Sequence, residues 1–128
     1  MNSEGIELTE AEWEVMEFLW ANPGSIGRDI TESMAEKKGW SRSTTLTLLT
    51  RLENKGAVAG SAEGKKRFTP LVSREDAALR ETKNLLDRVY NGSVGMLVTA
   101  FTKKQRLTKA EIDEMYAILH ELEVKDDD

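Results

Sequence analysis

Apolar residues recur at helical spacing near the start of the chain. One stripe is formed by Trp13, Met16 and Trp20. Residues three and four positions apart share one face of a helix, and aromatic side chains at this spacing are most often part of a core. Thr9, with Glu12 three residues later, is the pattern of a capping box at a helix start. Asn22-Pro23-Gly24 then ends the predicted first helix.

A second helix is predicted to begin at Ser25 and to end at Lys37. Its apolar face has residues spaced by about one helical turn, namely Ile26, Ile30 and Met34. Gly39 is the expected C-cap, because glycine readily adopts the left-handed conformation that ends many helices. Ser41 is then placed to cap a third helix through its hydroxyl group.

The predicted third helix, which ends at Gly56, has two faces of different character. Its apolar face, expected to pack on the first two helices, is formed by Thr45, Leu48, Leu49 and Leu52. The remaining positions include Arg42, Ser43, Thr44, Leu46, Thr47 and Arg51. This arrangement leaves Leu46 exposed, which would be an odd choice for a surface without a partner.

Two short strands are predicted after the third helix. Val58 belongs to the first strand, and Phe68 with residues 70–72 to the second, on either side of a turn at residues 61–64. Three short helices followed by a two-stranded hairpin is the order of a winged helix-turn-helix.

From Ser73 onwards the pattern is helical again. Asn91-Gly92 interrupts it, and an apolar segment follows at residues 94–101. Thr108 and Glu111 are the pattern of another capping box, and the final helix behind them is amphipathic.

The predicted fold is therefore mainly α with a small β-hairpin. We expect two domains, a winged-helix DNA-binding domain at residues 1–72 and a helical dimerisation domain at residues 73–128.

The helices after Ser73 carry too much apolar surface for a free-standing extension. Two readings remain open: they pair with a second copy of the chain, or they fold back on their own winged helix. The first reading predicts a homodimer with a core formed by Leu85, Leu86, Val89, Leu97, Ile112, Met115, Leu119 and Leu122.

Charge is distributed unevenly along the chain. The net charge is −5, yet between Lys38 and Arg67 seven basic residues face only two acidic ones, so this segment carries +5. A basic segment in an acidic chain indicates a localised anionic partner. The chain has no cysteine and a single histidine, His120, which excludes thiolate and histidine-pair metal sites. No apolar run is long enough to insert into a membrane, no signal peptide is evident, and the cytoplasm is the expected location.

The third helix and the hairpin tip have side chains suited to double-stranded DNA. Arginine can pair with guanine through two hydrogen bonds, Ser and Thr hydroxyls bond donors or acceptors, and a leucine or threonine methyl can touch thymine. Lysines at a wing would contact phosphates or the minor groove. The candidate DNA-binding residues are Arg42, Ser43, Thr44, Leu46, Thr47, Arg51, Lys65, Lys66 and Arg67.

Other readings of the same residues are possible. Basic residues are often only a solvated face, and a winged helix can serve as a protein-interaction module without binding DNA. A small metal-dependent hydrolase is a poorer hypothesis. The chain has no glycine-rich phosphate loop and no His–acid pair at useful spacing, so we expect neither catalysis nor a cofactor.

Two segments in particular resemble the penicillinase repressor family, of the BlaI and MecI type with a copper-responsive branch. One runs from Leu8 through Trp20, and the other from Trp40 to Gly56. Residues 86–92 and 107–112 extend the similarity over nearly the whole chain.

The resemblance implies a homodimeric winged-helix repressor that binds palindromic operators and dimerises through its C-terminal helices. In the antibiotic-responsive branch a membrane-bound sensor protease triggers cleavage before a phenylalanine, which matches the Ala100–Phe101 bond here. The family bond is typically Asn–Phe, so Ala100 is a departure. The copper branch holds metal through C-terminal cysteines, which this chain lacks. Thr45 stands where the family commonly has Val or Ile. A hydroxyl there can bond back to a helix carbonyl, so a small stability cost and no change of fold are expected.

Overall fold

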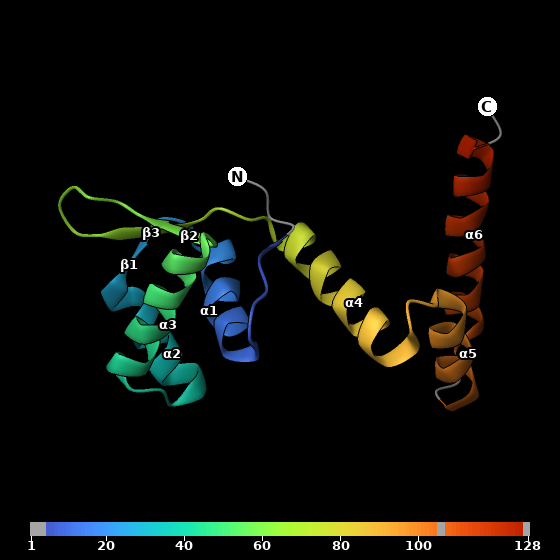
Figure 1. Cartoon of the computed structure of the whole chain (residues 1–128), viewed down its shortest axis with the longest axis horizontal. Helices are drawn as coiled ribbons and strands as arrows, with labels where there is room; N and C mark the ends of the chain where they lie inside the picture. The colour runs from blue at the N-terminus through green and yellow to red at the C-terminus, as the bar shows by residue number, and fades with distance from the viewer. Residues whose placement is uncertain (1–4, 105–106, 127–128) are drawn as a thin grey trace. The chain divides into compact units, whose positions relative to one another are not determined.

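The computed structural model describes residues 5–104 and 107–126 (Figure 1). In chain order the elements are α1 (Glu10–Ala21), β1 (Ser25–Ile26), α2 (Gly27–Lys38), α3 (Arg42–Lys55), β2 (Val58–Gly60), β3 (Arg67–Pro70), α4 (Arg74–Tyr90), α5 (Val94–Lys104) and α6 (Lys109–Asp126). The fold is mainly helical with a small antiparallel sheet, which confirms the predicted fold class. The chain divides into two compact units, residues 1–84 and 85–128.

The helix ends follow the local signals of the sequence. Thr9 and Glu12 form the predicted capping box, with Thr9 N donating to Glu12 Oε1 at 2.7 Å and Glu12 N donating to Thr9 Oγ1 at 3.1 Å. Ser41 Oγ accepts a hydrogen bond from the backbone N–H of Thr44 and caps α3. Gly39 and Gly56 end α2 and α3 in the left-handed conformation, with φ of 70° and 81°.

The core of the first unit lies between α1, α2, α3 and the sheet. Its buried apolar residues are Val15, Met16, Leu19, Ile30, Met34, Leu48, Leu49, Leu52, Ala57, Val58, Phe68 and Val72. The stripe predicted on α1 is only partly inside, because Trp13 and Trp20 are half-buried. Their rings meet edge to face at 5.1 Å, and the Trp20 indole N–H donates to the Val72 carbonyl oxygen. A polar ring edge explains why Trp20 stays at the rim.

The sheet has three strands in the order β1-β3-β2, one more than the predicted hairpin. Ser25 and Ile26 pair with Phe68 and Arg67 of β3, so the prediction that Ser25 begins the second helix is wrong. The Ser25 hydroxyl donates to the Asn22 carbonyl instead of capping the helix. Pairing with a distant strand overrides a pattern that, by itself, fits a helix.

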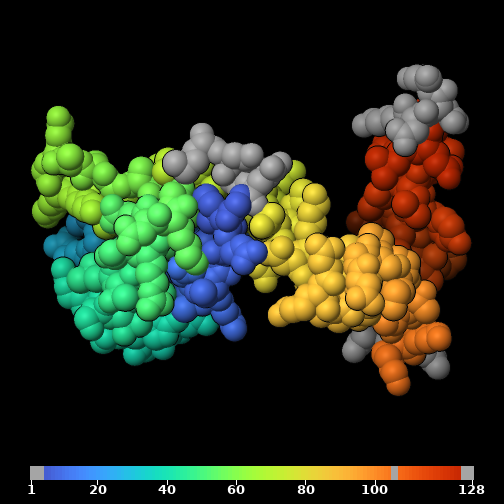
Figure 2. All heavy atoms as spheres, viewed as in Figure 1, coloured from blue at the N-terminus to red at the C-terminus, as the bar shows by residue number. Residues whose placement is uncertain are grey.

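The wing consists of β2, β3 and the turn between them, residues 58–70. Its turn extends away from the helices (Figures 1 and 2). β3 begins at Arg67 and ends at Pro70, earlier than predicted. Val72 lies beyond the strand and is buried in the core.

The first turns of α4 belong to the winged-helix unit. Arg74 forms a paired ion contact with Glu17 of α1, with N···O distances of 2.7 and 3.1 Å, and its guanidinium lies over the Trp13 ring. Arg80 approaches Glu7 at 3.6 Å. The structural division between Asn84 and Leu85 therefore falls inside α4, whereas the functional boundary at residues 72/73 stays a prediction.

The second unit contains the end of α4, with α5 and α6. Asn91 and Gly92 both have positive φ and separate α4 from α5, as predicted. Thr108 and Glu111 form the predicted capping box of α6. None of the side chains described in α4, α5 and α6 is buried. In the part of the chain that the structure describes, no helix has the length and apolar character needed to cross a membrane.

Candidate nucleic-acid interface

The packing of α3 determines which of its side chains face outwards. Thr45, Leu48, Leu49 and Leu52 are at most 5% exposed, which confirms the predicted apolar face. The side chains on the opposite side form what we call the polar face of α3. They are Arg42, Ser43, Thr44, Thr47 and Arg51, all of them exposed.

The groups of the polar face differ in how free they are. Arg42 and Arg51 form no ion pair with any described residue, so both guanidinium groups are available to an anion. The hydroxyls of Ser43 and Thr44 lie 3.3 and 3.0 Å from the hydroxyl of the cap residue Ser41. Thr47 is exposed in the middle of the face, and its hydroxyl has no hydrogen bond to the residues that the structure describes.

A cleft of about 460 Å³ opens between α3, the start of α2 and the wing. Leu46 and Phe68 form apolar parts of its wall, and Leu46 is half-buried, not exposed as predicted. A Cβ at Gly27 would lie 3.9 Å from each of these side chains, an ordinary van der Waals distance. The cationic side chains around the cleft are Arg28, Arg42, Lys65 and Lys66.

A second, smaller hollow of about 230 Å³ lies on the polar face itself. It is lined by Ser43, Thr44, Thr47, Leu48 and Arg51. The polar face thus carries a hollow rich in hydroxyls and borders a basic cleft next to the wing. A helix face of this kind can enter a groove of DNA, with some side chains reaching base edges and others reaching phosphates.

The three cations at the wing are in three different situations. Lys65 has no ion pair within the described residues. Lys66 Nζ lies 2.9 Å from Glu53 Oε1 of α3. Arg67 donates from Nη1 to the Gly24 carbonyl at 3.0 Å, which fixes the guanidinium but leaves its charge unbalanced. Nothing in the sequence distinguishes these three residues, whereas the structure shows that their contacts differ.

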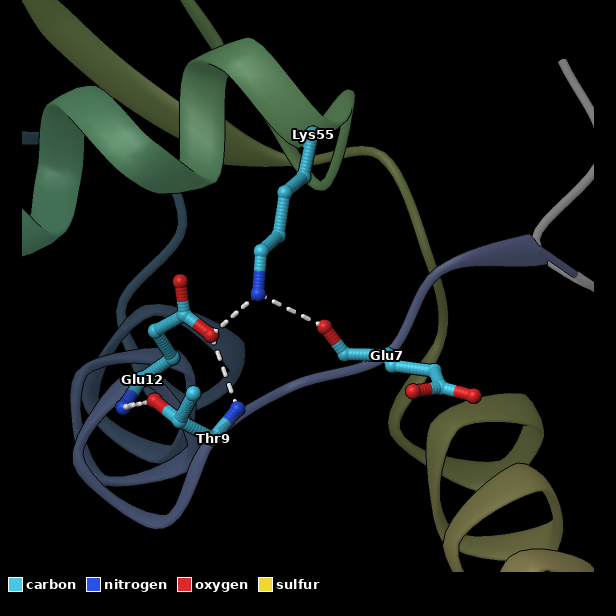
Figure 3. Close-up of polar contacts among 4 residues, drawn as sticks. All are labelled: Glu7, Thr9, Glu12 and Lys55. Atoms are coloured by element: carbon cyan, nitrogen blue, oxygen red, sulfur yellow. Dashed lines mark hydrogen bonds and ion pairs between the residues drawn. The ribbon is translucent and has the colours of Figure 1, made fainter.

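The C-terminal end of α3 is fixed to α1 through Lys55 (Figure 3). Its ammonium group donates to Glu12 Oε1 at 2.5 Å and to the Glu7 carbonyl at 2.8 Å. Glu12 is fully buried, and the same oxygen also accepts from Thr9 N. This contact joins residues 43 positions apart and ties the last residue of α3 to the first turn of α1.

Burial and hydrogen bonding act on Glu12 in opposite directions. Burial is the largest single influence and opposes ionisation, but the hydrogen bonds from Lys55 and Thr9 together outweigh it. The pKa of Glu12 therefore lies below its ordinary value, and the carboxylate is charged at neutral pH. Its second oxygen, Oε2, is buried without a hydrogen-bond partner among the described residues.

Thr45 differs from its predicted behaviour. Its side chain is fully buried, and Oγ1 has no hydrogen-bond partner in the described parts of the chain. The bond back to a helix carbonyl that a hydroxyl at this position can form is not made by Thr45. The contact occurs instead at the exposed Thr50, whose hydroxyl donates to the Leu46 carbonyl at 3.1 Å. Thr45 points into the close-packed core, and the result is a buried hydroxyl without a partner.

The residues predicted for dimerisation lie in the second unit, at its surface. Leu86, Leu97 and Met115 are half-buried. The exposed members are Leu85, Val89, Ile112, Leu119 and Leu122, with exposed fractions between 41% and 56%. Ile112, Met115, Leu119 and Leu122 follow one another at three and four residues along α6, so they share one side of that helix.

The predicted cleavage bond lies within α5. Phe101 is half exposed, and Ala100 lines an open groove of about 670 Å³ together with Met96 and Lys103. A helical bond must unwind before it can enter the extended binding site of a protease.

Sequence reasoning missed two residues of this region. Arg28 borders the basic cleft and is the second residue of α2. This position could have identified it as a candidate phosphate contact, since helix starts in this fold lie near the backbone of DNA. The ion pair between Glu53 and Lys66 had no local signal, because the pair is 13 residues apart and depends on the wing's path.

The sequence pattern of the penicillinase repressor family matches residues 8–121. The methicillin resistance regulatory protein MecI of Staphylococcus aureus strain N315 is 34% identical over 121 residues, which cover 94% of this chain and 98% of that protein. The penicillinase repressor of Bacillus licheniformis is 31% identical over 116 residues, which cover 90% and 91%. These relatives are named as a regulatory protein and a repressor, which confirms the expectation of a non-enzymatic regulator.

Two solved structures match the winged-helix part. The solution structure of the DNA-binding domain of the repressor BlaI matches with a TM-score of 0.51 and 30% identity, covering 55% of this chain and 87% of that one. The monomeric form of Bacillus licheniformis BlaI, in complex with the blaP half-operator, matches with a TM-score of 0.51 and 29% identity, covering 56% and 88%. The winged-helix assignment is thereby confirmed.

Proposed function

The chain belongs to the penicillinase repressor family, and we propose that it is a transcriptional repressor that binds a palindromic DNA operator as a homodimer. The observation that carries the proposal is the polar face of α3, with two unpaired arginines beside a projecting wing. The BlaI structure solved with a half-operator supports DNA as the partner of this face.

We assign base contacts to the middle of the polar face. Arg51 and Arg42 have no ion pair with any described residue, and an arginine can pair with guanine through two hydrogen bonds. Thr47 has a free hydroxyl, and Ser43 and Thr44 lie at the helix start. Leu46, at the wall of the basic cleft, presents part of its side chain to a thymine methyl.

Phosphate contacts are assigned to the wing. Lys65 and Arg67 are the proposed contacts, because neither has an acidic partner among the described residues, whereas Lys66 is paired with Glu53. Phosphate contacts carry no sequence information but fix the register of the protein on DNA and make affinity depend on salt.

The proposed dimer rests on the apolar side chains that the second unit leaves at its surface. Leu119 and Leu122 are more than half exposed on one side of α6. Burying such residues against a second copy removes apolar area from water. Each protomer then reads one half-site, and two-fold symmetry matches the operator's palindrome.

Relief of repression is proposed to follow cleavage at Ala100–Phe101 by a sensor-protease system, as the family resemblance implies. Cutting α5 would separate the winged helix from α6 and thereby weaken the dimer. The second half-site is then no longer held at an effective concentration in the millimolar range. Ala100→Asn, which restores the bond typical of the family, should be cut faster than the native chain in cells with an active sensor. Absence of any product ending near residue 100 in both proteins would refute this route.

The DNA-binding proposal can be tested before the operator sequence has been identified. Genomic fragments that co-purify with the full chain are sequenced, and the enriched palindrome is titrated with protein at several salt concentrations. Arg51→Ala should weaken operator binding by about 1–3 kcal/mol. Arg88→Ala, an exposed arginine of α4, is the matched control and should leave affinity unchanged.

The same titration separates the repressor from a protein-interaction module. Binding weaker than about 100 μM to every duplex, even at low salt, is no better than non-specific association. That result would overturn the proposed function.

A further inference from the structure

The ion pair between Glu53 and Lys66 places an acid beside one of the three wing cations. Lys66 Nζ is 2.9 Å from Glu53 Oε1 and 5.3 Å from the centroid of the Phe68 ring, which is itself buried. The carboxylate and the aromatic face both favour the ammonium group in this position. Lys66 is thus held against the body of the winged helix, although it belongs to the basic tip of the wing.

Gly60 makes this position of Lys66 possible. It pairs with Phe68 in the β2–β3 ladder. A Cβ at this residue would overlap Lys66 Cε and would lie 3.1 Å from Glu53 Oε2. Gly60 does not have a positive φ, so its backbone conformation does not require glycine. Glycine is required here because Lys66 approaches the backbone too closely for a Cβ.

We propose that Glu53 limits the number of phosphate contacts made by the wing, by holding Lys66 as an internal ion pair in the place a DNA phosphate would take. Glu53 is a positioning residue that acts through Lys66. The proposal rests on the proposed DNA-binding function and adds a regulatory contact to it. A phosphate that captured Lys66 would leave the Glu53 carboxylate, which is 71% shielded from solvent, unpaired and close to DNA. Like-charge repulsion therefore opposes the exchange.

The consequence is a lower affinity for DNA of any sequence. Sequence-independent binding grows with the number of cations that release counterions from phosphates. Because a genome offers a vast excess of non-specific sites, a repressor finds its operator more readily when this affinity is restrained. Base contacts by the polar face of α3 are left unchanged by the pair.

The salt dependence of binding to a random-sequence 30-base-pair duplex tests the proposal in the full chain. In a plot of log affinity against log salt the line falls, and here the slope means the steepness of that fall. Lys65→Gln should make it shallower by about 0.9 per protomer, because the variant removes a phosphate contact. Lys66→Gln should leave the slope unchanged. Glu53→Gln should raise it by about 0.9, so that affinity falls an extra threefold or so between 50 and 200 mM salt. The double variant Glu53→Gln with Lys66→Gln should return the slope to the native value.

Glu36→Gln is the matched control, since Glu36 is exposed on α2 and has no ion pair in the described residues. It changes the net charge as Glu53→Gln does and should not change the slope. An equal effect of the two glutamate variants, or a Lys66→Gln slope reduced as far as that of Lys65→Gln, would overturn the inference. Failure of the native chain to bind any duplex would instead refute the proposed function. Circular dichroism of each variant shows that the slopes belong to folded protein.

Discussion

The two units of this chain use apolar residues in opposite ways. The winged-helix unit buries a continuous core, in which Leu19, Ile30 and Leu52 have no exposed surface. In the unit that begins at Leu85, the described side chains include none that is buried, and large apolar residues such as Leu119 remain more than half exposed. One unit therefore completes its core within a single chain, whereas the other leaves large apolar residues exposed, the surface that the proposed dimer would cover.

This difference indicates how DNA affinity can be regulated. Single amphipathic helices are only marginally stable in water, so α5 and α6 depend on tertiary or subunit contacts for stability. A folded winged helix keeps its polar face whether or not a partner is present. Loss of the dimer would remove the coupling between two half-sites and leave the DNA-contacting residues intact.

The largest expected effect comes from placing a charge in the proposed dimer core. Leu119→Asp should produce a monomer, because burial of an unpaired carboxylate is costly. Affinity for a two-half-site operator should fall by about 10²- to 10⁴-fold, while affinity for an isolated half-site should stay the same. Sedimentation and operator titration measure the two quantities.

His120→Asp is the matched control, because it adds an acid at the next position of α6, outside the line formed by Ile112, Met115, Leu119 and Leu122. It should leave the dimer intact. If Leu119→Asp sediments as the native protein does, α6 does not form the dimer core.

The next prediction compares the two units directly in the monomeric Leu119→Asp background. Leu52→Ala should lower the free energy of unfolding by about 2–5 kcal/mol, because Leu52 is fully buried. Leu122→Ala should cost less than about 1 kcal/mol there, because Leu122 is 53% exposed without a partner. Urea denaturation is followed by tryptophan fluorescence for the winged-helix unit, which contains all three tryptophans, and by circular dichroism for the helices of both units. Similar losses for both variants would mean that the second unit has its own core.

Much of the fold could be predicted because its signals are local. Capping by Thr9, Ser41 and Thr108 depends on residues three positions apart, and the helix stops at Gly39 and Gly56 depend on single residues. The two faces of α3 also follow from spacing alone.

The parts that could not be predicted depend on residues distant in sequence. β1 consists of two residues whose only strand signal is their partner β3. Leu46 was expected to be exposed, but the wing's Phe68 shares its cleft. The pairing of Lys66 with Glu53 likewise could not be predicted without knowing the path of the wing. The sequence therefore identified the candidate cations but did not show which of them form ion pairs within the protein.

The contact between Lys55 and Glu12 should add a smaller, pH-dependent term to the stability of the winged-helix unit. Glu12→Gln removes a charge from a buried hydrogen-bonded pair, and we expect a loss of about 1–3 kcal/mol at pH 7. The folded-state pKa of Glu12 is lowered, so its contribution is fully present above the unfolded pKa of about 4.3 and is lost as pH falls through the folded value. The difference between native and variant stability should therefore be constant from neutral pH to about pH 5 and shrink below about pH 4.

Glu32→Gln is a suitable control for this experiment, because Glu32 is exposed in the middle of α2 and forms no ion pair with the described residues. Its effect should stay within about 0.5 kcal/mol at every pH. A Glu12→Gln difference that persists unchanged at pH 3 would show that the carboxylate's charge is not what stabilises the contact.

The smallest expected effect has the opposite sign and is also confined to the winged-helix unit. Thr45→Val replaces a buried hydroxyl that has no partner among the described residues with a methyl group of similar shape, so the desolvation cost disappears. Stability should rise by about 1 kcal/mol, seen as a higher urea midpoint with an unchanged slope. Operator affinity should not change, because Thr45 lies on the buried side of α3. Thr47→Val is the counterpart on the polar face: it should leave stability within about 0.5 kcal/mol and weaken operator binding. A lower midpoint for Thr45→Val would mean that the Thr45 hydroxyl has a hydrogen-bond partner in solution, such as water. The core of the winged-helix unit would then be less tightly closed than its contrast with the second unit implies.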